Sequence, residues 1–308
     1  MDDNTPHTND IVPAHRVHIP KVITVSNGHS LALAIQGAPP YDHFSKAITY
    51  EAPLDFTVAG IALDHAPAAI KEIVPILQAH PTQTLQKKEY LFVGPTGSGK
   101  KTIANAIAQT AGWSCATVSV SLFCNEYQDS AKAGLLRAVN KILKDKTKCV
   151  IVLDYLTLIT NKRNRMYNDA DASDAACTVF DMCNKRDDIL VIGTTDDESN
   201  LATQVARRFG RDGIIEIELP RLRTSAMLLT HLFQNELLAE IIDDQCIENI
   251  ARTCKNKNFR GIISIYKKAA SHARRERRSI QRTDIDELIQ VCEQNWYSTV
   301  VGCILQDI

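Results

Sequence analysis

The chain has 308 residues, of which 44% are apolar and 23% are charged, and its 35 basic and 36 acidic side chains give a formal net charge of −1. This composition is that of a globular protein with room for one large and one small domain. The balanced charge excludes a general electrostatic attraction to nucleic acid or acidic membranes. The apolar runs are too short to cross a bilayer, and the amino terminus lacks a secretory signal pattern. We therefore expect an intracellular protein, cytoplasmic or nuclear, without a membrane partner.

The order of predicted elements divides the chain into four segments. Residues 1–50 form an N-terminal extension, in which Asn27 and Gly28 separate two β-like runs and predict either a hairpin or a disordered arm. Residues 51–220 alternate β-rich runs with amphipathic helices, which predicts an α/β domain with a mostly parallel sheet covered on both faces. Residues 221–297 contain four helical stretches and predict a small all-helical domain, followed by a tail at 298–308.

A glycine-rich loop stands between a buried-type strand and a helix. The run GPTGSGKKT has the GxxxxGK pattern in the structural context that the pattern needs. Glycines let backbone N–H groups curl around phosphate oxygens, the following helix adds partial positive charge, and the lysine reaches the outer phosphates. The sequence therefore predicts a nucleotide-phosphate site that comprises Gly94, Pro95, Thr96, Gly97, Ser98, Gly99, Lys100, Lys101 and Thr102.

The residue after the loop lysine departs from this pattern. A Ser or Thr hydroxyl normally ligates magnesium there, but Lys101 carries an ammonium that can only donate hydrogen bonds. Thr102 is no simple substitute, because one residue along a helix is a rotation of about 100°. Two alternatives stay open at this point. Lys101 either weakens magnesium binding, or its charge takes the place of the metal and makes nucleotide binding independent of it.

Three later segments, together with the loop, resemble a known family. CVIVLDYLTLI is similar to a Walker B strand, ILVIGTTDD to a sensor 1 strand and VARRFGRDGIIEIELP to an arginine-finger region. Over residues 50–297 the chain resembles the AAA-type ATPases of the AAA+ superfamily, and most of all the first ATPase domain of valosin-containing-protein-like unfoldases. The resemblance implies a three-layer α/β/α P-loop domain followed by a helical lid. It also implies ATP and Mg²⁺ as cofactors and an oligomer, a hexameric ring of identical or different subunits.

The positions that the family uses for hydrolysis are only partly kept. Asp154 matches the Walker B carboxylate that holds magnesium. The glutamate that should follow is Tyr155, whose phenol is a poor base at neutral pH. The sensor 1 asparagine is replaced by Asp196, which either supplies part of the missing carboxylate function or belongs to an acidic loop without chemistry. The resemblance therefore implies reduced hydrolysis.

Further positions carry over from the family one by one. Arg208 and Arg211 match the arginines that one subunit offers to the γ-phosphate of its neighbour. Tyr127 aligns with the pore-loop aromatic that grips a polypeptide substrate. For the nucleotide itself, the resemblance implies three more contacts: a backbone bend past the adenine at Gly60, an adenine-side imidazole at His231, and a sensor 2 arginine at Arg260.

Three functions follow in order of preference. The first is an ATP-binding AAA module that couples nucleotide state to protein remodelling, with reduced hydrolysis. The second is a non-hydrolysing scaffold subunit that donates arginine fingers in a mixed ring. The third is an origin-recognition-like DNA-binding ATPase, favoured by the VLD strand and a basic run at residues 272–282, but without the winged-helix domain that this class adds. Because that run has no interleaved aromatic residues, we rank nucleic acid last among the partners.

Overall fold

The computed structural model describes residues 47–278, 283 and 284, except 81, 83, 84, 86, 121–130, 161–168 and 235–243. All of these residues belong to one compact unit, Pro40–Ile308. The predicted hairpin at Asn27 and Gly28, the predicted pore-loop residue Tyr127 and most of the fourth lid helix lie outside the described residues, as does the predicted tail.

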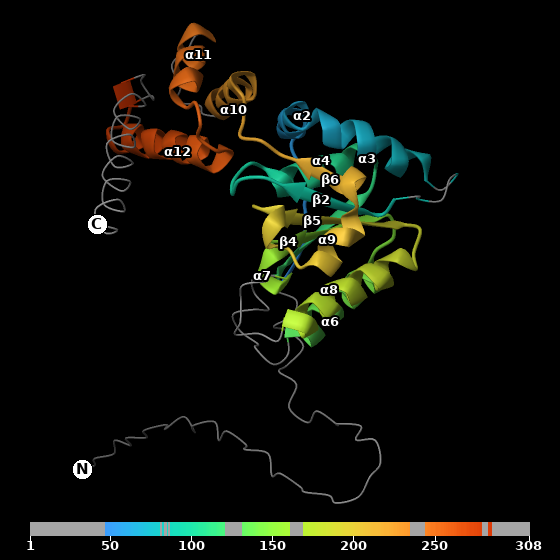
Figure 1. The fold of residues 1–308 in the computed structure, drawn as a ribbon. Helices are drawn as coiled ribbons and strands as arrows, with labels where there is room; N and C mark the ends of the chain where they lie inside the picture. Colours follow the sequence, from blue (N-terminus) through green and yellow to red (C-terminus); the bar gives the residue numbers. More distant parts are fainter. Residues whose placement is uncertain are drawn as a thin grey trace, which may run out of the picture. The chain divides into compact units, whose positions relative to one another are not determined.

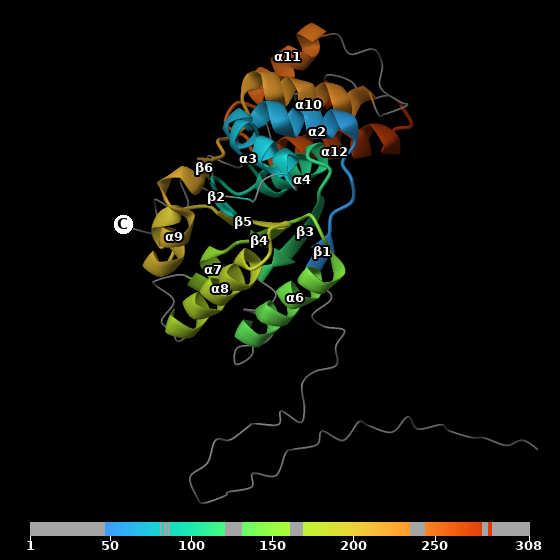
Figure 2. The ribbon, with the colours of Figure 1, turned by 90° about the vertical axis from the view of Figure 1, so that its right-hand side faces the viewer.

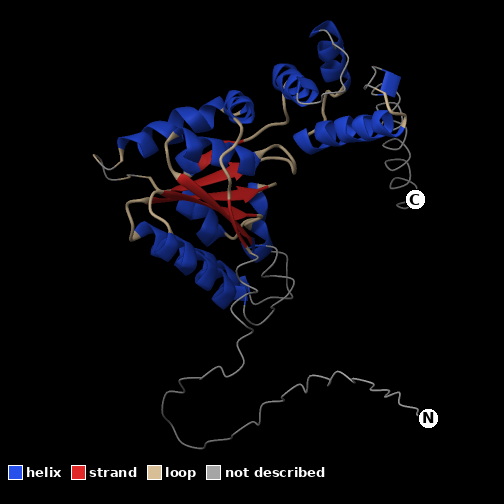
Figure 3. Ribbon diagram, turned by 180° about the vertical axis from the view of Figure 1, so that it is seen from behind, coloured by secondary structure: helices blue, strands red, loops and turns tan. Residues whose placement is uncertain are grey.

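A six-stranded sheet forms the centre of the larger domain (Figures 1 and 3). Its neighbouring strands are parallel, apart from the antiparallel pair β1 and β3 at one edge, so the predicted mostly parallel sheet is confirmed. The first strand lies within the predicted N-terminal extension, so the sheet includes residues before position 51. The spatial order is β1 (Ile48–Tyr50), β3 (Ser114–Ser119), β4 (Cys149–Asp154), β5 (Ile189–Thr195), β2 (Glu89–Val93) and β6 (Ile214–Glu216).

Helices cover both faces of the sheet, which explains why every residue of its central strands β4 and β5 is buried (Figure 2). Successive side chains of a strand point to opposite faces. In β4, Val150 and Val152 belong to one apolar core, whereas Ile151 and Leu153 belong to the other. The first core includes residues of α2 (Phe56–His65), α3 (Pro67–Ala79) and α4 (Lys100–Thr110), and the second includes residues of α6 (Ala131–Asp145), α8 (Asp169–Asn184) and α9 (Thr203–Phe209).

Three short helices complete the connections of the larger domain. They are α7 (Thr157–Thr160), after β4, and two 3₁₀ turns, η1 (Glu198–Asn200) and η2 (Arg211–Gly213), on either side of α9.

A smaller helical domain follows β6, as the sequence predicts. It contains α10 (Leu222–Gln234), α11 (Asp244–Thr253) and α12 (Phe259–Arg275), which share an apolar core of their own. Ile61 of α2 belongs to this core, and so the helical domain packs on the first helix of the larger one. Among the described residues, no helix is long and apolar enough to cross a membrane.

Strand order brings three segments that are distant in sequence together at the carboxyl ends of the strands. β4 and β5 are adjacent and parallel, as are β5 and β2, so their carboxyl ends lie side by side. The glycine-rich loop follows β2, Asp196 follows β5, and Asp154 is the last residue of β4. The Gly94 N–H donates to the Thr195 carbonyl oxygen at 3.1 Å, which ties the start of the loop to the end of β5. These carboxyl ends are the place where open α/β sheets bind ligands.

Candidate nucleotide-binding site

The glycine-rich loop has the backbone shape that a phosphate cradle requires. A Cβ atom on Gly94 would stand 2.0 Å from the Ile217 carbonyl oxygen, so a larger residue does not fit there. Gly99 caps α4 in the left-handed region, with φ = 91°, which favours glycine. The first N–H groups of a helix have no partner within the helix and carry partial positive charge. The start of α4, at Lys100 and Lys101, therefore directs donors to the loop.

Two side chains of the loop support phosphate binding. The hydroxyl of Ser98 is fully buried and has no hydrogen-bond partner among the described residues. The Lys100 side chain is only 9% exposed and folds back over the loop, where its ammonium donates to the carbonyl oxygens of Gly94 and Pro95 (3.0 Å to Pro95). A buried hydroxyl without a partner and a lysine held over the loop fit the phosphates of a nucleotide.

Asp196 closes over the loop from the end of β5. Its Oδ1 atom lies 3.0 Å from the Lys100 ammonium, and its Oδ2 atom accepts a hydrogen bond from the Thr96 hydroxyl at 2.6 Å. Both carboxylate oxygens are therefore engaged in this state. Before Asp196 could polarise an attacking water, as the sequence suggested, it would have to release at least one of these partners.

The buried carboxylate of Asp154 pairs with the lysine that follows the loop lysine. The Lys101 ammonium lies 3.0 Å from Asp154 Oδ2, and the exposed fractions of the two side chains are 51% and 9%. The other carboxylate oxygen, Oδ1, accepts from the Thr194 hydroxyl at 2.9 Å. A buried charge is costly unless it is paired and hydrogen-bonded, and here Lys101 and Thr194 supply both requirements.

These residues do not fit a magnesium ion held in the manner of other P-loop proteins. That arrangement uses a loop hydroxyl together with the strand carboxylate. At the hydroxyl position stands Lys101, which has no lone pair to offer and lies against the carboxylate itself. Thr102 lines a different, apolar pocket, in agreement with the predicted rotation away from the phosphate side.

Tyr155 follows Asp154, at the position where the family resemblance implies a catalytic glutamate. Its backbone is in the left-handed region, with φ = 59°, which is uncommon for a bulky residue. The Tyr155 N–H donates to the Thr194 hydroxyl at 3.1 Å, and that hydroxyl in turn donates to Asp154. The turn after β4 thus holds the Asp154 carboxylate in place and puts Tyr155 directly after it in the chain.

The helical domain also contacts the glycine-rich loop. The Asn258 side chain caps α12 by accepting from the Gly261 N–H at 2.7 Å, and it also donates to the Thr96 carbonyl oxygen at 2.8 Å. The next residue, Phe259, donates its N–H to the Gly97 carbonyl oxygen at 3.1 Å. Its ring lies so close to Gly99 that a Cβ there would be 3.2 Å from two ring atoms. The start of α12 therefore rests directly on the loop.

His65 supports the phenylalanine from the end of α2. The imidazole meets the Phe259 ring edge to face, with centroids 4.9 Å apart, and its Nε2 atom lies 3.1 Å from the Glu218 carbonyl oxygen. Burial lowers the pKa of His65, although nearby backbone carbonyl groups oppose the change. His65 therefore makes this contact between the two domains in its neutral form.

A small apolar pocket of ≈150 Å³ lies where the loop, α2 and the helical domain meet. Its walls are almost wholly apolar, which suits the flat face of a nucleobase. Ligand pockets usually measure about 300–1,000 Å³, so this one is smaller than a site that encloses a whole nucleotide. The lining residues are Val58, Ile61, Ala62, Gly99, Thr102, Ile103, Leu228, Phe259 and Ile263.

Three residues predicted to contact the nucleoside lie around this pocket but not among its lining residues. Gly60 is in the middle of α2, exposed and with open space around it, so the predicted backbone bend is absent and a continuous helix capped by Asp55 takes its place. His231 is half-buried on α10, one turn beyond Leu228. Arg260 is exposed, and the two residues before it, Asn258 and Phe259, contact the glycine-rich loop.

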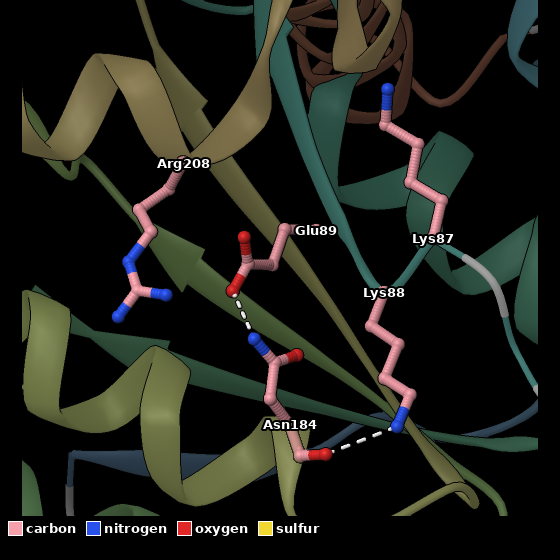
Figure 4. A pocket seen from close by; sticks show the side chains of 5 residues that line it. All are labelled: Lys87, Lys88, Glu89, Asn184 and Arg208. Atoms are coloured by element: carbon pink, nitrogen blue, oxygen red, sulfur yellow. Dashed lines mark hydrogen bonds between the residues drawn. The ribbon is translucent and has the colours of Figure 1, made fainter.

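The two predicted arginine fingers differ in their surroundings. Arg208, at the end of α9, pairs with Asp181 of α8 and also donates to the Cys177 carbonyl oxygen at 3.2 Å. Arg211 is exposed in η2. Arg208 also borders a polar pocket of ≈300 Å³ together with Lys87, Lys88, Glu89 and Asn184 (Figure 4).

Glu89 is the acidic wall of this second pocket. Its carboxylate accepts from the Asn184 side-chain amide at 2.7 Å, while Lys88 donates to the Asn184 carbonyl oxygen at 3.1 Å (Figure 4). Burial raises the pKa of Glu89, and the bond from Asn184 opposes the rise. Glu89 is the first residue of β2, whereas the glycine-rich loop follows the last residue of β2. This pocket therefore lies at the opposite end of the strand from the loop.

Sequence reasoning did not identify His65, Thr194 and Asn258 as parts of the site. Asn258 precedes a helix and has the pattern of an N-cap, a signal that predicts the helix start but not the loop contact. Thr194 is the residue of the sensor strand that alternation places beside Asp154. For His65, no local signal was available, because its partners are more than 150 residues away in sequence.

A parallel sheet with a glycine-rich loop, a buried loop lysine and a strand-end aspartate defines a P-loop nucleotide-binding protein. Residues 90–219 match the model of the AAA family, "ATPase family associated with various cellular activities". This segment of the chain is similar to the AAA family, whose members bind ATP, typically use Mg²⁺ and act as oligomeric rings.

The chain is similar in sequence to three kinds of protein. The chain is 24% identical over 292 residues to a proteasome-activating nucleotidase of Methanococcus maripaludis, a match that covers 91% of this chain and 69% of that protein. It is 30% identical over 194 residues to the ATP-dependent zinc metalloprotease FtsH 1 of Alkaliphilus metalliredigens, covering 61% and 32%. It is 27% identical over 226 residues to the ATPase-like fidgetin of Schizosaccharomyces pombe, covering 68% and 33%. The chain thus spans only part of each relative.

The fold is shared with a solved AAA domain. The FIGL-1 AAA domain in complex with ADP superposes with a TM-score of 0.65 at 18% identity, covering 83% of this chain and 92% of that one. Another structure of the FIGL-1 AAA domain gives 0.66, covering 80% and 86%. At this level of identity the likeness concerns the fold.

Proposed function

We propose that this protein is an ATP-binding AAA module that hydrolyses ATP slowly or not at all and transmits its nucleotide state to a protein substrate through an oligomer. The observation that carries the proposal is the loop itself, with Lys100 folded over the carbonyl oxygens of Gly94 and Pro95 and the unpartnered Ser98 hydroxyl in the same loop. The relatives named for proteasome activation and proteolysis support protein as the substrate class.

The same geometry supports a low rate of hydrolysis. Phosphoryl transfer depends on positioning and on electrostatic stabilisation of the developing charge. Tyr155 offers no carboxylate to orient water, and Asp196 has both oxygens engaged by Lys100 and Thr96. Loss of one such group typically costs about 10²–10³ in rate.

Nucleotide binding would also move the helical domain. The apolar pocket beside Phe259 is smaller than a nucleotide, and Asn258 and Phe259 contact the loop where phosphates would bind. A nucleotide would therefore displace the start of α12, which is rigidly part of the lid core through residues such as Ile262. In this proposal, that displacement is the motion passed to neighbouring subunits and to the substrate.

The test is calorimetric titration of the purified chain with ATP, beside Lys100→Ala, with hydrolysis followed over hours. We expect binding that weakens by about tenfold or more in Lys100→Ala, because a charge-assisted contact is lost. Lys141→Ala is the matched control, since it removes an exposed lysine on α6 without touching the loop. If ATP failed to bind the unmodified chain, or bound both lysine variants equally, the proposal would be wrong.

A non-hydrolysing scaffold subunit is the limiting case of the same proposal. It is favoured by the joint replacement of the hydroxyl and the glutamate by Lys101 and Tyr155. In that case, turnover by the chain alone would be undetectable, and its addition to an active AAA partner would raise the partner's rate. Arg208 could serve as the finger only after it leaves Asp181, so Asp181→Ala would strengthen the activation.

The DNA-binding alternative gains no support from the basic run. Within it, Arg278 pairs with Asp284 and Glu276, and His272 lies 3.0 Å from Asp284. These charges are partly neutralised inside the chain, so they offer less to phosphates of nucleic acid.

A further inference from the structure

Among the described residues, the ion pair between Lys101 and Asp154 departs from the usual P-loop arrangement. The ammonium stands 3.0 Å from Asp154 Oδ2, at the residue position whose hydroxyl would otherwise ligate a metal. In P-loop proteins, the metal at this place bridges phosphate oxygens and neutralises their charge. A tethered ammonium beside the same carboxylate brings positive charge to the same place without a free ion.

We infer that Lys101 is the resident counter-ion of the site, and that it allows the chain to bind the triphosphate of ATP without a divalent metal. The inference rests on the proposed nucleotide-binding function and specifies how that site is charged.

The burial of the pair makes a metal a poor competitor. The Asp154 side chain is only 9% exposed and already has Lys101 on one oxygen and Thr194 on the other. A divalent ion bound there would have to displace the ammonium or lie beside a charge of its own sign, and such repulsion is strong near a protein surface. If the half-exposed Lys101 side chain swung away, the loop would still provide no hydroxyl at that position.

The charges of the site balance without an ion. Lys100 faces Asp196 at 3.0 Å and Lys101 faces Asp154 at 3.0 Å, so two cations are matched by two carboxylates. An incoming phosphate could take over both ammonium groups, and their flexible stems let them follow it. Lys101 is 51% exposed, so it is accessible to a ligand, whereas Asp154 is not.

The experiment compares ATP affinity with excess EDTA and with excess Mg²⁺, by calorimetry, for the full chain and three variants. In the unmodified chain we expect the two dissociation constants to agree within about twofold, because neither charge nor ligand comes from the metal. Lys101→Thr restores the hydroxyl, and it should bind about tenfold or more tightly with Mg²⁺ than with EDTA. Lys101→Met should bind weakly in both conditions. Lys141→Thr, the same change on α6, should behave like the unmodified chain.

A second readout needs no nucleotide. Removal of Lys101 leaves the buried Asp154 carboxylate without its cation, and a metal that binds there would stabilise the fold. Mg²⁺ should therefore raise the melting temperature of Lys101→Thr and leave that of the unmodified chain unchanged. This measurement also shows whether the variant folds.

The outcomes separate the inference from the function on which it rests. If the unmodified chain bound ATP about tenfold or more tightly with Mg²⁺ than with EDTA, the inference would be overturned while ATP binding stood. If ATP bound in neither condition, the proposed function would fail first and the inference with it. Equal affinities in both conditions for Lys101→Thr, with no thermal shift on adding Mg²⁺, would also overturn the role given to Lys101.

Discussion

The phosphate loop is bordered by two surfaces of opposite character. On the sheet side, Asp154 and Asp196 meet the loop lysines through ion pairs, whereas on the lid side Asn258 and Phe259 meet it through an amide and an aromatic ring. The sheet side determines the charge of the site, and the lid side determines the space above it. Changes on the sheet side should therefore alter nucleotide affinity and turnover, whereas changes on the lid side should alter the stability of the contact between the two domains.

The largest effect is expected from rebuilding the sheet side. A chain with both Lys101→Thr and Tyr155→Glu regains the hydroxyl and the carboxylate that P-loop ATPases use to hold metal and orient water. We expect its ATP turnover in Mg²⁺ to rise about 100-fold or more over the unmodified chain, the size of a typical single-group effect. Phosphate release in a continuous assay measures it, with each single variant as a control. A rate equal to that of the unmodified chain would mean that hydrolysis is limited elsewhere.

The next effect concerns the lid side. In Phe259→Ala, the ring that packs on Gly99 and His65 is lost, and because Phe259 is half-buried we expect about 1–2 kcal/mol of lost stability. Amide hydrogen exchange at the start of α12 should accelerate as well. The neighbouring change Arg260→Ala affects an exposed side chain and should cost under about 0.5 kcal/mol. Equal losses in the two variants would show that Phe259 does not hold the lid on the loop.

A smaller effect separates two roles for Asp196. In Asp196→Asn the Lys100 ammonium loses its carboxylate partner and becomes available to phosphate, so ATP affinity should rise by about fivefold, equivalent to ~1 kcal/mol for a half-exposed pair. Asp197→Asn, one residue further along the η1 cap, should leave affinity unchanged. If Asp196 instead acts on water, the main change would be a lower turnover at unchanged affinity.

The smallest effect is a pH dependence of the domain contact at His65. Burial lowers the pKa of this imidazole in the folded chain, so protonation favours unfolding. The His65 contact contributes fully to folding stability above the ordinary imidazole pKa of about 6.5. This contribution is lost as the pH falls from that pKa toward the lowered pKa of the folded chain. Between about pH 7.5 and 5.5, denaturant unfolding should show a steeper loss of stability in the unmodified chain than in His65→Gln. If the two proteins lost stability equally as the pH fell, His65 would not be the source of the pH dependence.

The sheet and its carboxyl-edge site could be predicted because their signals are local. The central strands contain short apolar runs, and the order of loop, Asp154 and Asp196 follows from strand pairing in a parallel sheet. The lid contacts could not be predicted in the same way. Asn258 and Thr96 are 162 residues apart, and their hydrogen bond depends on how two separately folded cores pack. The bend expected at Gly60 failed because a capped, continuous helix forms there, which the family pattern did not indicate.

The ion pair of Lys101 could be predicted only in part. The sequence showed that a cation replaces a hydroxyl, and this left two alternatives for the metal. Only the position of β4 beside β3 and β5, with Asp154 buried at its end, shows where the ammonium finds its partner. A substitution in a motif therefore becomes interpretable once the residue that it contacts is known.

The most direct test of the central claim, that side chains supply the positive charge of this site, is a crystal structure grown with ATP and Mn²⁺. Anomalous scattering from manganese locates the ion independently of other density. The account predicts that the Lys101 ammonium contacts a phosphate oxygen and that no anomalous peak lies beside Asp154. A manganese peak on Asp154, with Lys101 turned away from it, would contradict the claim.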